Sequence, residues 1–149
     1  AVSNILRGMG ALSAGELAGE RIAVALDTKE QEDEHSCFSD NTLADIVGNA
    51  VGIQRAYTGE LEGVDGTSLA DVVAKVDPKA NEALLEQLQA NVDLAKSLEQ
   101  DGTFEQIIRS DDDSEGRAKM DQLVTDLQAQ GDAIAALGAA LGYDVSLEI

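Results

Sequence analysis

The sequence predicts an all-α fold, and composition and hydrophobic spacing are the basis for that prediction. Hydrophobic residues make up 44% of the 149 residues, but aromatic residues make up only 3%. Such a core must be built from Ala, Leu, Val and Ile, which fill contacts between helices. Apolar residues also recur at spacings of three, four and seven in four long windows, as in amphipathic helices. We therefore expect one domain, residues 1–149, folded as an antiparallel four-helix bundle with short accessory helices.

The expected helices follow these windows in order. The first helix covers about Ser3 to Leu26 and the second about Thr42 to Thr58. The third begins at Pro78, because proline is favoured in a first helical turn, and its apolar face is Leu84, Leu85, Leu88, Val92, Ala95 and Leu98. The apolar face of the fourth is Met120, Leu123, Val124, Leu127, Ile134, Leu137 and Leu141. Short helices are expected at Leu69–Val76 and Phe104–Ser110, and an extended tail at Tyr143–Ile149.

Two glycine pairs predict a tight crossing of the first two helices. Gly15 and Gly19 lie four residues apart in the first helix, as do Gly48 and Gly52 in the second. A glycine inside a helix costs roughly 1 kcal/mol relative to alanine. Close approach of two helix backbones would explain both pairs, and chance occurrence is the alternative.

The charge of the chain limits its partners. Ten Lys and Arg against 29 Asp and Glu give a formal net charge of −19. Such a surface repels phosphate backbones and anionic lipids, so nucleic acid is excluded as a partner and membrane binding is disfavoured. No apolar run approaches the roughly 20 residues of a transmembrane helix. The chain begins within a helical pattern and lacks a signal peptide, so we expect a processed or truncated product.

A long acidic connection between the first two helices is the main candidate for function. Residues 28–41 read TKEQEDEHSCFSDN and have no apolar period, and long connections of this kind are usually functional or disordered. Glu32 and His35 have the Glu-x-x-His spacing of di-iron bundles, but the chain has one histidine, so a self-contained di-iron centre is excluded. A single divalent metal remains an option, with ligands from His35, Glu32, Glu34 and the neighbouring acids. Iron, zinc and manganese all suit these residue types, and a solvated acidic loop is the alternative.

Two carboxylates interrupt the apolar stripe of the first helix. Glu16 and Glu20 lie one turn apart among apolar neighbours, next to Arg21. Buried carboxylates must be paired, protonated or bound to a cation. We expect the 32–41 segment to fold over the end of the first two helices, with its acids turned toward these three residues and Asp40, Asn41 or Thr42 capping the second helix. Glu16, Glu20, Arg21 and Asp40 are therefore the candidate ligand-binding residues; the alternative is that the stripe drifts and both glutamates meet solvent.

The segment Gly15–Ile46, centred on EDEHSCFSDNT at residues 32–42, resembles the imelysin family, which includes iron-regulated protein A and insulin-cleaving metalloproteinases. DGTSLADVVAKVDP, residues 65–78, is similar as well. The likeness is to the C-terminal half of a typical member. It implies an all-helical fold of two halves with a functional site in the cleft between them, a periplasmic, secreted or lipoprotein-anchored setting, and a link to iron acquisition. The missing N-terminal half would then be a partner of this chain.

The family hallmark Gly-x-His-x-x-Glu belongs to the N-terminal half and is absent here, because Ser36, Cys37 and Phe38 follow His35. Two functions remain. The first is an iron-regulated protein that binds a metal or a small ligand. The alternative is part of a metallopeptidase whose hallmark motif lies in the missing half. Since a catalytic zinc typically keeps three protein ligands, we expect no catalytic residue and no peptide hydrolysis from this chain alone.

Overall fold

The protein is all-α in the computed structural model, which describes residues 1–63 and 66–146. The first long helix is continuous and consists of α1 (Val2–Ala11), a π-helical segment (Leu12–Ala23) and α2 (Val24–Thr28). The other long helices are α3 (Thr42–Thr58), α5 (Pro78–Ser97) and α7 (Glu115–Ala140). Two short helices, α4 (Leu69–Val76) and α6 (Phe104–Ile108), precede α5 and α7, and single 3-10 turns cover Gln31–Asp33 and Leu98–Gln100. The described part of the chain contains no β-strand.

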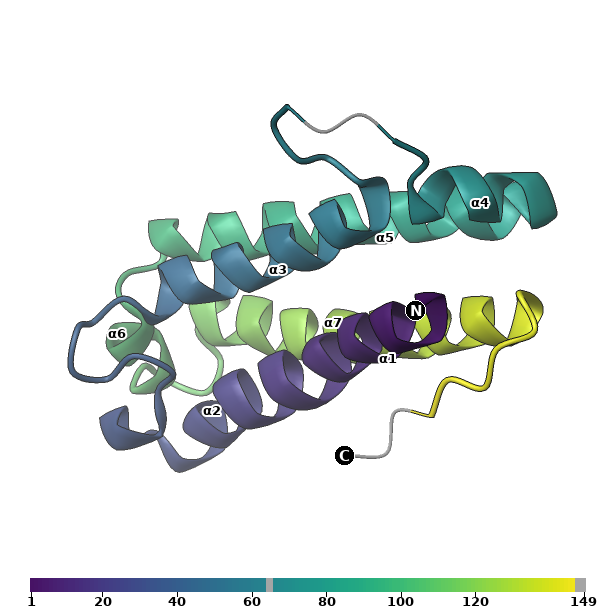
Figure 1. Ribbon diagram of the computed structural model, residues 1–149. Helices are drawn as coiled ribbons and strands as arrows, with labels where there is room; N and C mark the ends of the chain where they lie inside the picture. Colours follow the sequence, from purple (N-terminus) through teal and green to yellow (C-terminus); the bar gives the residue numbers. More distant parts are fainter. Residues whose placement is uncertain (64–65, 147–149) are drawn as a thin grey trace.

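Figure 1 shows the four long helices side by side, each antiparallel to the next along the chain. The first helix packs on α3 and α7, and α5 completes the bundle between α3 and α7. The connection from α2 to α3 and the turn that carries α6 therefore lie at the same end of the bundle, whereas α4 lies at the other end (Figure 1). This arrangement confirms the predicted fold class.

The expected helix bounds agree closely with the structure. The second helix and the first short helix have the predicted bounds, and α6 ends two residues earlier than expected. The bounds agree because the 3.6-residue apolar period and the caps point to the same positions. Asp77, for example, accepts a capping hydrogen bond of 3.0 Å from the Ala80 amide, next to Pro78. Residues 143–146 of the predicted tail are not helical, and residues 147–149 lie outside the described residues.

The core has two apolar parts and a buried polar layer. One part includes Leu17, Ile22, Ile46, Phe104, Met120 and Leu123, and the other includes Leu6, Ile53, Tyr57, Leu84, Leu88 and Ile134. The polar layer is formed by three buried residues on three helices. Gln130 donates to Ser13 Oγ at 2.9 Å and accepts from Asn91 Nδ2 at 2.9 Å, and Ser13 donates to the Leu127 carbonyl at 2.7 Å. Because buried polar groups need partners, this chain of bonds favours a single register of the helices.

The predicted glycine crossing is wrong. Gly48 and Gly52 face open space, since a Cβ added at either position would meet nothing within 4 Å. The close approach lies instead between the first helix and α7, where a Cβ on Gly131 would be 2.6 Å from Ala14 Cβ and 3.1 Å from the Gly10 carbonyl. The spacing of glycines predicts a helix face without side chains, but it does not predict whether another helix packs against that face.

Candidate functional site

The acidic loop, residues 29–41, is folded by its own hydrogen bonds. It begins at Lys29, which has a left-handed backbone (φ 60°) and ends α2. Thr28 Oγ1 donates to the Asp33 carboxylate at 2.7 Å, and the Ser36 hydroxyl donates to the Asp45 carboxylate on α3. The loop therefore has a defined path and is attached to both of the helices that it connects.

Glu34 is the buried acid of this loop, with only 5% of its surface exposed. Its Oε2 accepts a hydrogen bond of 3.0 Å from the Thr42 hydroxyl, which in turn accepts from the Ser36 amide at 3.2 Å. Its other oxygen, Oε1, is buried and has no hydrogen-bond partner. A buried carboxylate oxygen without a partner is costly, so this atom marks a place where a proton or a cation would stabilise the protein.

The surroundings of Glu34 explain its electrostatics. Burial is the main cause that raises the pKa of the Glu34 carboxyl, and the negative charges of Asp40 and Glu105 raise it further. The Thr42 hydrogen bond and the positive charge of Arg109 act in the opposite direction. The acidic loop therefore lies close to α6, which carries Glu105 and precedes Arg109. Two elements far apart in sequence supply charges to one carboxyl group.

The other predicted ligands do not form a metal-binding group with Glu34. Glu32, His35 and Asp40 are exposed, and Asp40 has a positive φ of 51°. Within residues 1–63 and 66–146, no three His, Cys, Asp or Glu side chains come together as a group that could hold a metal ion. The expected capping bond is also absent from α3: Asn41 stands at the cap position, but its side chain donates to Asp45 at 3.3 Å and does not bond the helix amides.

None of Glu16, Glu20 and Arg21 is buried, so the structure supports the alternative in which the apolar stripe drifts and both glutamates meet solvent. Glu20 and Arg21 are exposed, and Arg21 forms an ion pair of 3.4 Å with the half-exposed Glu16. The π-helical segment is the physical reason. Its i→i+5 hydrogen bonds space the buried positions four and five residues apart, and these positions are Ser13, Leu17, Ala18 and Ile22. An apolar stripe that follows the α-helical period drifts off this inner face, so both glutamates meet solvent.

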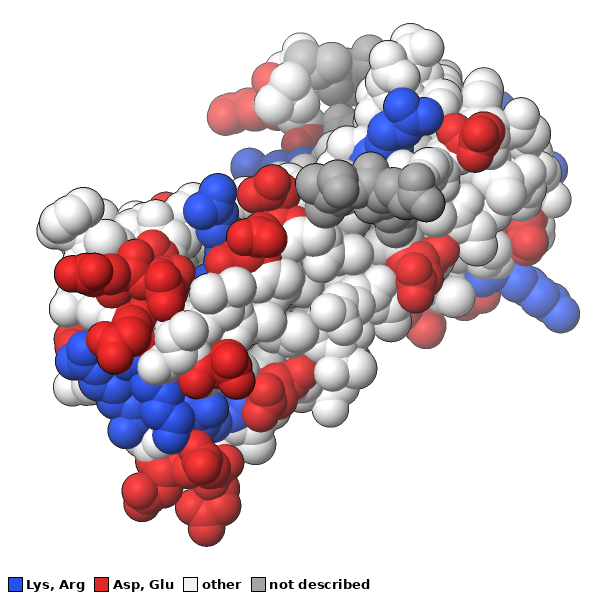
Figure 2. All heavy atoms as spheres, turned by 90° about the horizontal axis from the view of Figure 1, so that it is seen from below, with Lys and Arg blue, Asp and Glu red and all other residues white. Residues whose placement is uncertain are grey.

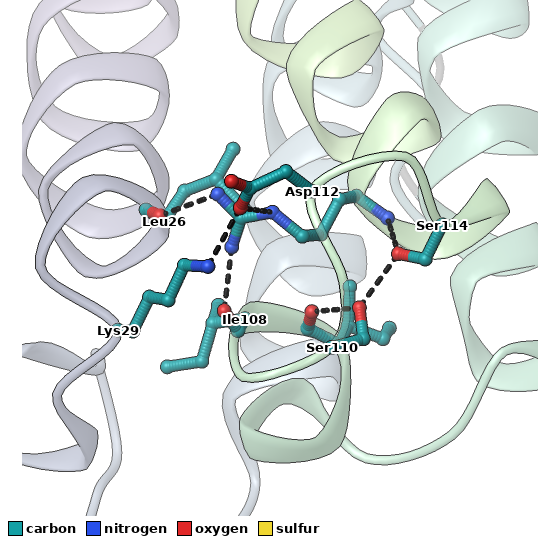
Figure 3. Close-up of polar contacts among 8 residues, drawn as sticks. Leu26, Lys29, Ile108, Ser110, Asp112 and Ser114 are labelled. Atoms are coloured by element: carbon teal, nitrogen blue, oxygen red, sulfur yellow. Dashed lines mark hydrogen bonds and ion pairs between the residues drawn. The ribbon is translucent and has the colours of Figure 1, made fainter.

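A buried arginine on α7, Arg117, fixes the start of the acidic loop, and its partners Leu26, Ile108 and Asp112 are labelled in Figure 3. Arg117 donates to the Leu26 carbonyl at 2.9 Å and to the Ile108 carbonyl, so that it bonds the last turns of α2 and α6 together. Asp112 connects this arginine to the loop, because its carboxylate lies 2.6 Å from Lys29 Nζ and 3.6 Å from Arg117 Nε. These two cations lower the pKa of Asp112, with the Lys29 hydrogen bond as the main cause. Sequence reasoning missed Arg117, although its position three residues before Met120 places it on the apolar face of the fourth helix.

Basic and acidic side chains lie next to one another at the end of the bundle that carries the acidic loop. Figure 2 shows a patch of basic side chains, bordered by acidic ones, at the end of the molecule where α2 lies. Arg109 contributes to these contacts, because it pairs with Glu105 and donates to the Lys29 carbonyl at 3.3 Å. The cations next to the acidic loop are thus already engaged by acids of the same chain.

A groove of about 420 Å³ lies beside the acidic loop. Its walls come from the end of the loop, the start of α3 and the turn between α5 and α6. They are lined by Asp40, Asn41, Leu43, Ala44, Glu99, Gly102, Thr103, Phe104 and Gln106. The sequence pattern did not predict this groove, because it forms only where two connections meet at one end of the bundle.

The fold and site define an all-helical protein with an acidic, partly buried loop at one end of a bundle. The family model for imelysin matches residues 1–134. The chain therefore belongs to the imelysin family, as the resemblance in its sequence indicated. The comparison with curated proteins gave no match. No helix in the described part of the chain is long and apolar enough to cross a membrane.

Proposed function

We propose that this chain is the part of an imelysin-like protein that contributes an acidic half-site for a divalent metal, and that the protein serves iron acquisition. The observation that supports this most directly is Glu34 Oε1, a buried carboxylate oxygen without a partner. A divalent cation at this oxygen would relieve the burial of the carboxylate charge. Family membership adds support, since the family includes iron-regulated proteins.

The residues of the acidic loop can supply part of the ligand set of a divalent cation. Glu34 supplies one preplaced oxygen, and Asp40 is close enough to raise the pKa of Glu34. Glu32 and His35 flank Glu34 in the loop, and carboxylate and imidazole ligands suit iron, zinc and manganese. A bound metal would supply a positive charge to hold an anionic or oxygen-bearing ligand. Since a protein site for zinc typically uses three or four protein ligands, we assign the remaining ligands to the half of the protein that carries Gly-x-His-x-x-Glu.

This assignment gives the chain a binding role. One histidine and loop carboxylates are a poor set for activating a water molecule, for which metallopeptidases commonly use two histidines and a carboxylate. The proposed setting is the periplasm or cell envelope, with a lipoprotein anchor as an option for the full-length protein. Proposed partners are the missing N-terminal half and the metal or small ligand.

Thermal melting with and without Fe²⁺, Zn²⁺ and Mn²⁺ tests the metal site. A ligand at a hundredfold excess over its dissociation constant stabilises the folded state by about 2.7 kcal/mol. We expect the metal-induced rise in melting temperature to be smaller in Glu34→Gln than in the parent. Glu16→Gln is the matched control, because it removes a charge of the same kind from a half-exposed site, and it should respond as the parent does. Equal responses in all three proteins, or no response in the parent, would contradict the proposal.

A further inference from the structure

Phe38 is the most exposed large apolar side chain among the described residues, with a relative exposure of 103%. The turn that carries it is closed by two backbone hydrogen bonds of 3.0 Å, from the Ser39 and Asp40 amides to the Ser36 carbonyl. Ser36 is itself bonded to Asp45 on α3. The loop therefore holds an aromatic ring away from the protein at a fixed place. Scattered exposed apolar residues are ordinary, so the surface next to Phe38 decides what this ring could do.

That surface is the groove beside the acidic loop. Asp40 and Asn41 line it and follow Phe38 by only two and three residues. Leu43, Ala44 and Phe104 give its walls apolar atoms. Phe38 is not one of the lining residues, but its place two residues before Asp40 puts the projecting ring near this groove of about 420 Å³.

The residues that line the groove include two acids and no Lys or Arg. No Lys or Arg occurs between Glu30 and Gln54 or between Ser97 and Ile108, the two segments that form it. The exposed acids of these two segments are Glu30, Glu32, Asp33, Asp40 and Glu99, of which Asp40 and Glu99 line the groove. Two of the cations that border these segments are already paired, Lys29 with Asp112 and Arg109 with Glu105. Lys96 lies three residues before Glu99. Complementary charge steers partners toward such a surface.

We propose that Phe38 and the adjoining groove form a docking surface for a cationic segment of another protein. An apolar side chain of the partner enters the groove, the partner covers the Phe38 ring, and Lys or Arg residues face the five exposed acids. A second copy of this chain is a poor occupant, since each copy has a net charge of −19. The inference rests on the proposed function in that it names a partner for the same end of the bundle.

Fluorescence anisotropy with two labelled synthetic peptides tests this surface. One peptide is amphipathic and built from Lys and Leu, and the other has Glu in place of Lys. We expect the parent to bind the Lys peptide and not the Glu peptide. Phe38→Ala should weaken binding at least tenfold, while Val76→Ala, at an exposed position on α4 at the other end of the bundle, should leave it unchanged.

A second pair of variants separates this surface from general charge attraction. Glu32→Gln with Asp40→Asn should weaken binding more than Glu82→Gln with Glu86→Gln, which removes the same charge from α5. No binding by the parent, or equal affinities for parent and Phe38→Ala, would overturn the inference, as would equal effects of the two double variants. The outcome is separable from the metal proposal, because the melting response to metals in Phe38→Ala reports only on the site at Glu34.

Discussion

Arg117 on α7 donates a hydrogen bond of 2.9 Å to the backbone carbonyl of Leu26 at the end of the first helix. The same guanidinium bonds the Ile108 carbonyl of α6. Helix C-termini leave carbonyl groups without partners, and here one buried side chain satisfies two of them. The contact joins three elements at the point where the acidic loop begins.

Replacing Arg117 with Met should destabilise the protein by about 2–4 kcal/mol, because two buried carbonyls lose a charged donor. Urea unfolding followed by circular dichroism measures this change. Arg7→Met is the control, since Arg7 is exposed on α1 and its loss should change stability by less than about 0.5 kcal/mol. Similar losses in both variants would show that the Arg117 contacts contribute little.

Gly131→Ala should destabilise the protein by about 1–3 kcal/mol, because the new methyl group would overpack the contact with Ala14 and the Gly10 carbonyl. Gly52→Ala should have the opposite effect and stabilise α3 by up to about 1 kcal/mol, since a Cβ there meets open space. Thermal melting of the two variants provides the comparison. If both were stabilising, the helices would not approach one another closely at Gly131.

The stability of the protein should fall between about pH 10 and pH 12 because of Tyr57. Burial raises the pKa of Tyr57 to about 12, and its hydroxyl donates to Asn81 Oδ1 at 2.7 Å. An unfolded tyrosine titrates near 10. The unfolded chain therefore releases this proton first, so the contribution is complete below pH 10 and is lost as the pH rises toward 12.

The ultraviolet absorbance of tyrosinate measures this titration directly. The parent should show a step near pH 12 that is missing from Tyr57→Phe, and the stability of Tyr57→Phe should depend less on pH over the same range. A single titration step with its midpoint near pH 10 would contradict the burial of Tyr57.

The helices were predictable because local signals agree with tertiary packing in this chain. The apolar period, Pro78 after Asp77, and the residues of the α5 and α7 faces all point to the observed bundle. The interior of the first helix was not predictable in this way. Its π-helical turns contain more residues than α-helical turns do. A prediction based on the α-helical period therefore places Glu16 and Glu20 on the buried face, whereas the structure places them at the surface.

The candidate site was predictable as a segment but not in its detail. The acidic loop has no apolar period, and nothing in its sequence distinguishes Glu34 from Glu32. The difference arises from Thr42, whose hydroxyl holds Glu34 beneath the loop, and from the approach of α6. Such contacts depend on how the helices and loops pack against one another, which cannot be read from a single sequence. The glutamate that turns inward is therefore visible only in the structure.

Paramagnetic broadening by Mn²⁺ of the backbone amide signals most directly tests the proposal that the acidic loop holds a cation at Glu34. At substoichiometric Mn²⁺, we expect the strongest broadening at residues 30–42 and at Glu105, and we expect it to be lost in Glu34→Gln but kept in Glu16→Gln. Strongest broadening at residues 16–21, or an unchanged pattern in Glu34→Gln, would contradict the account.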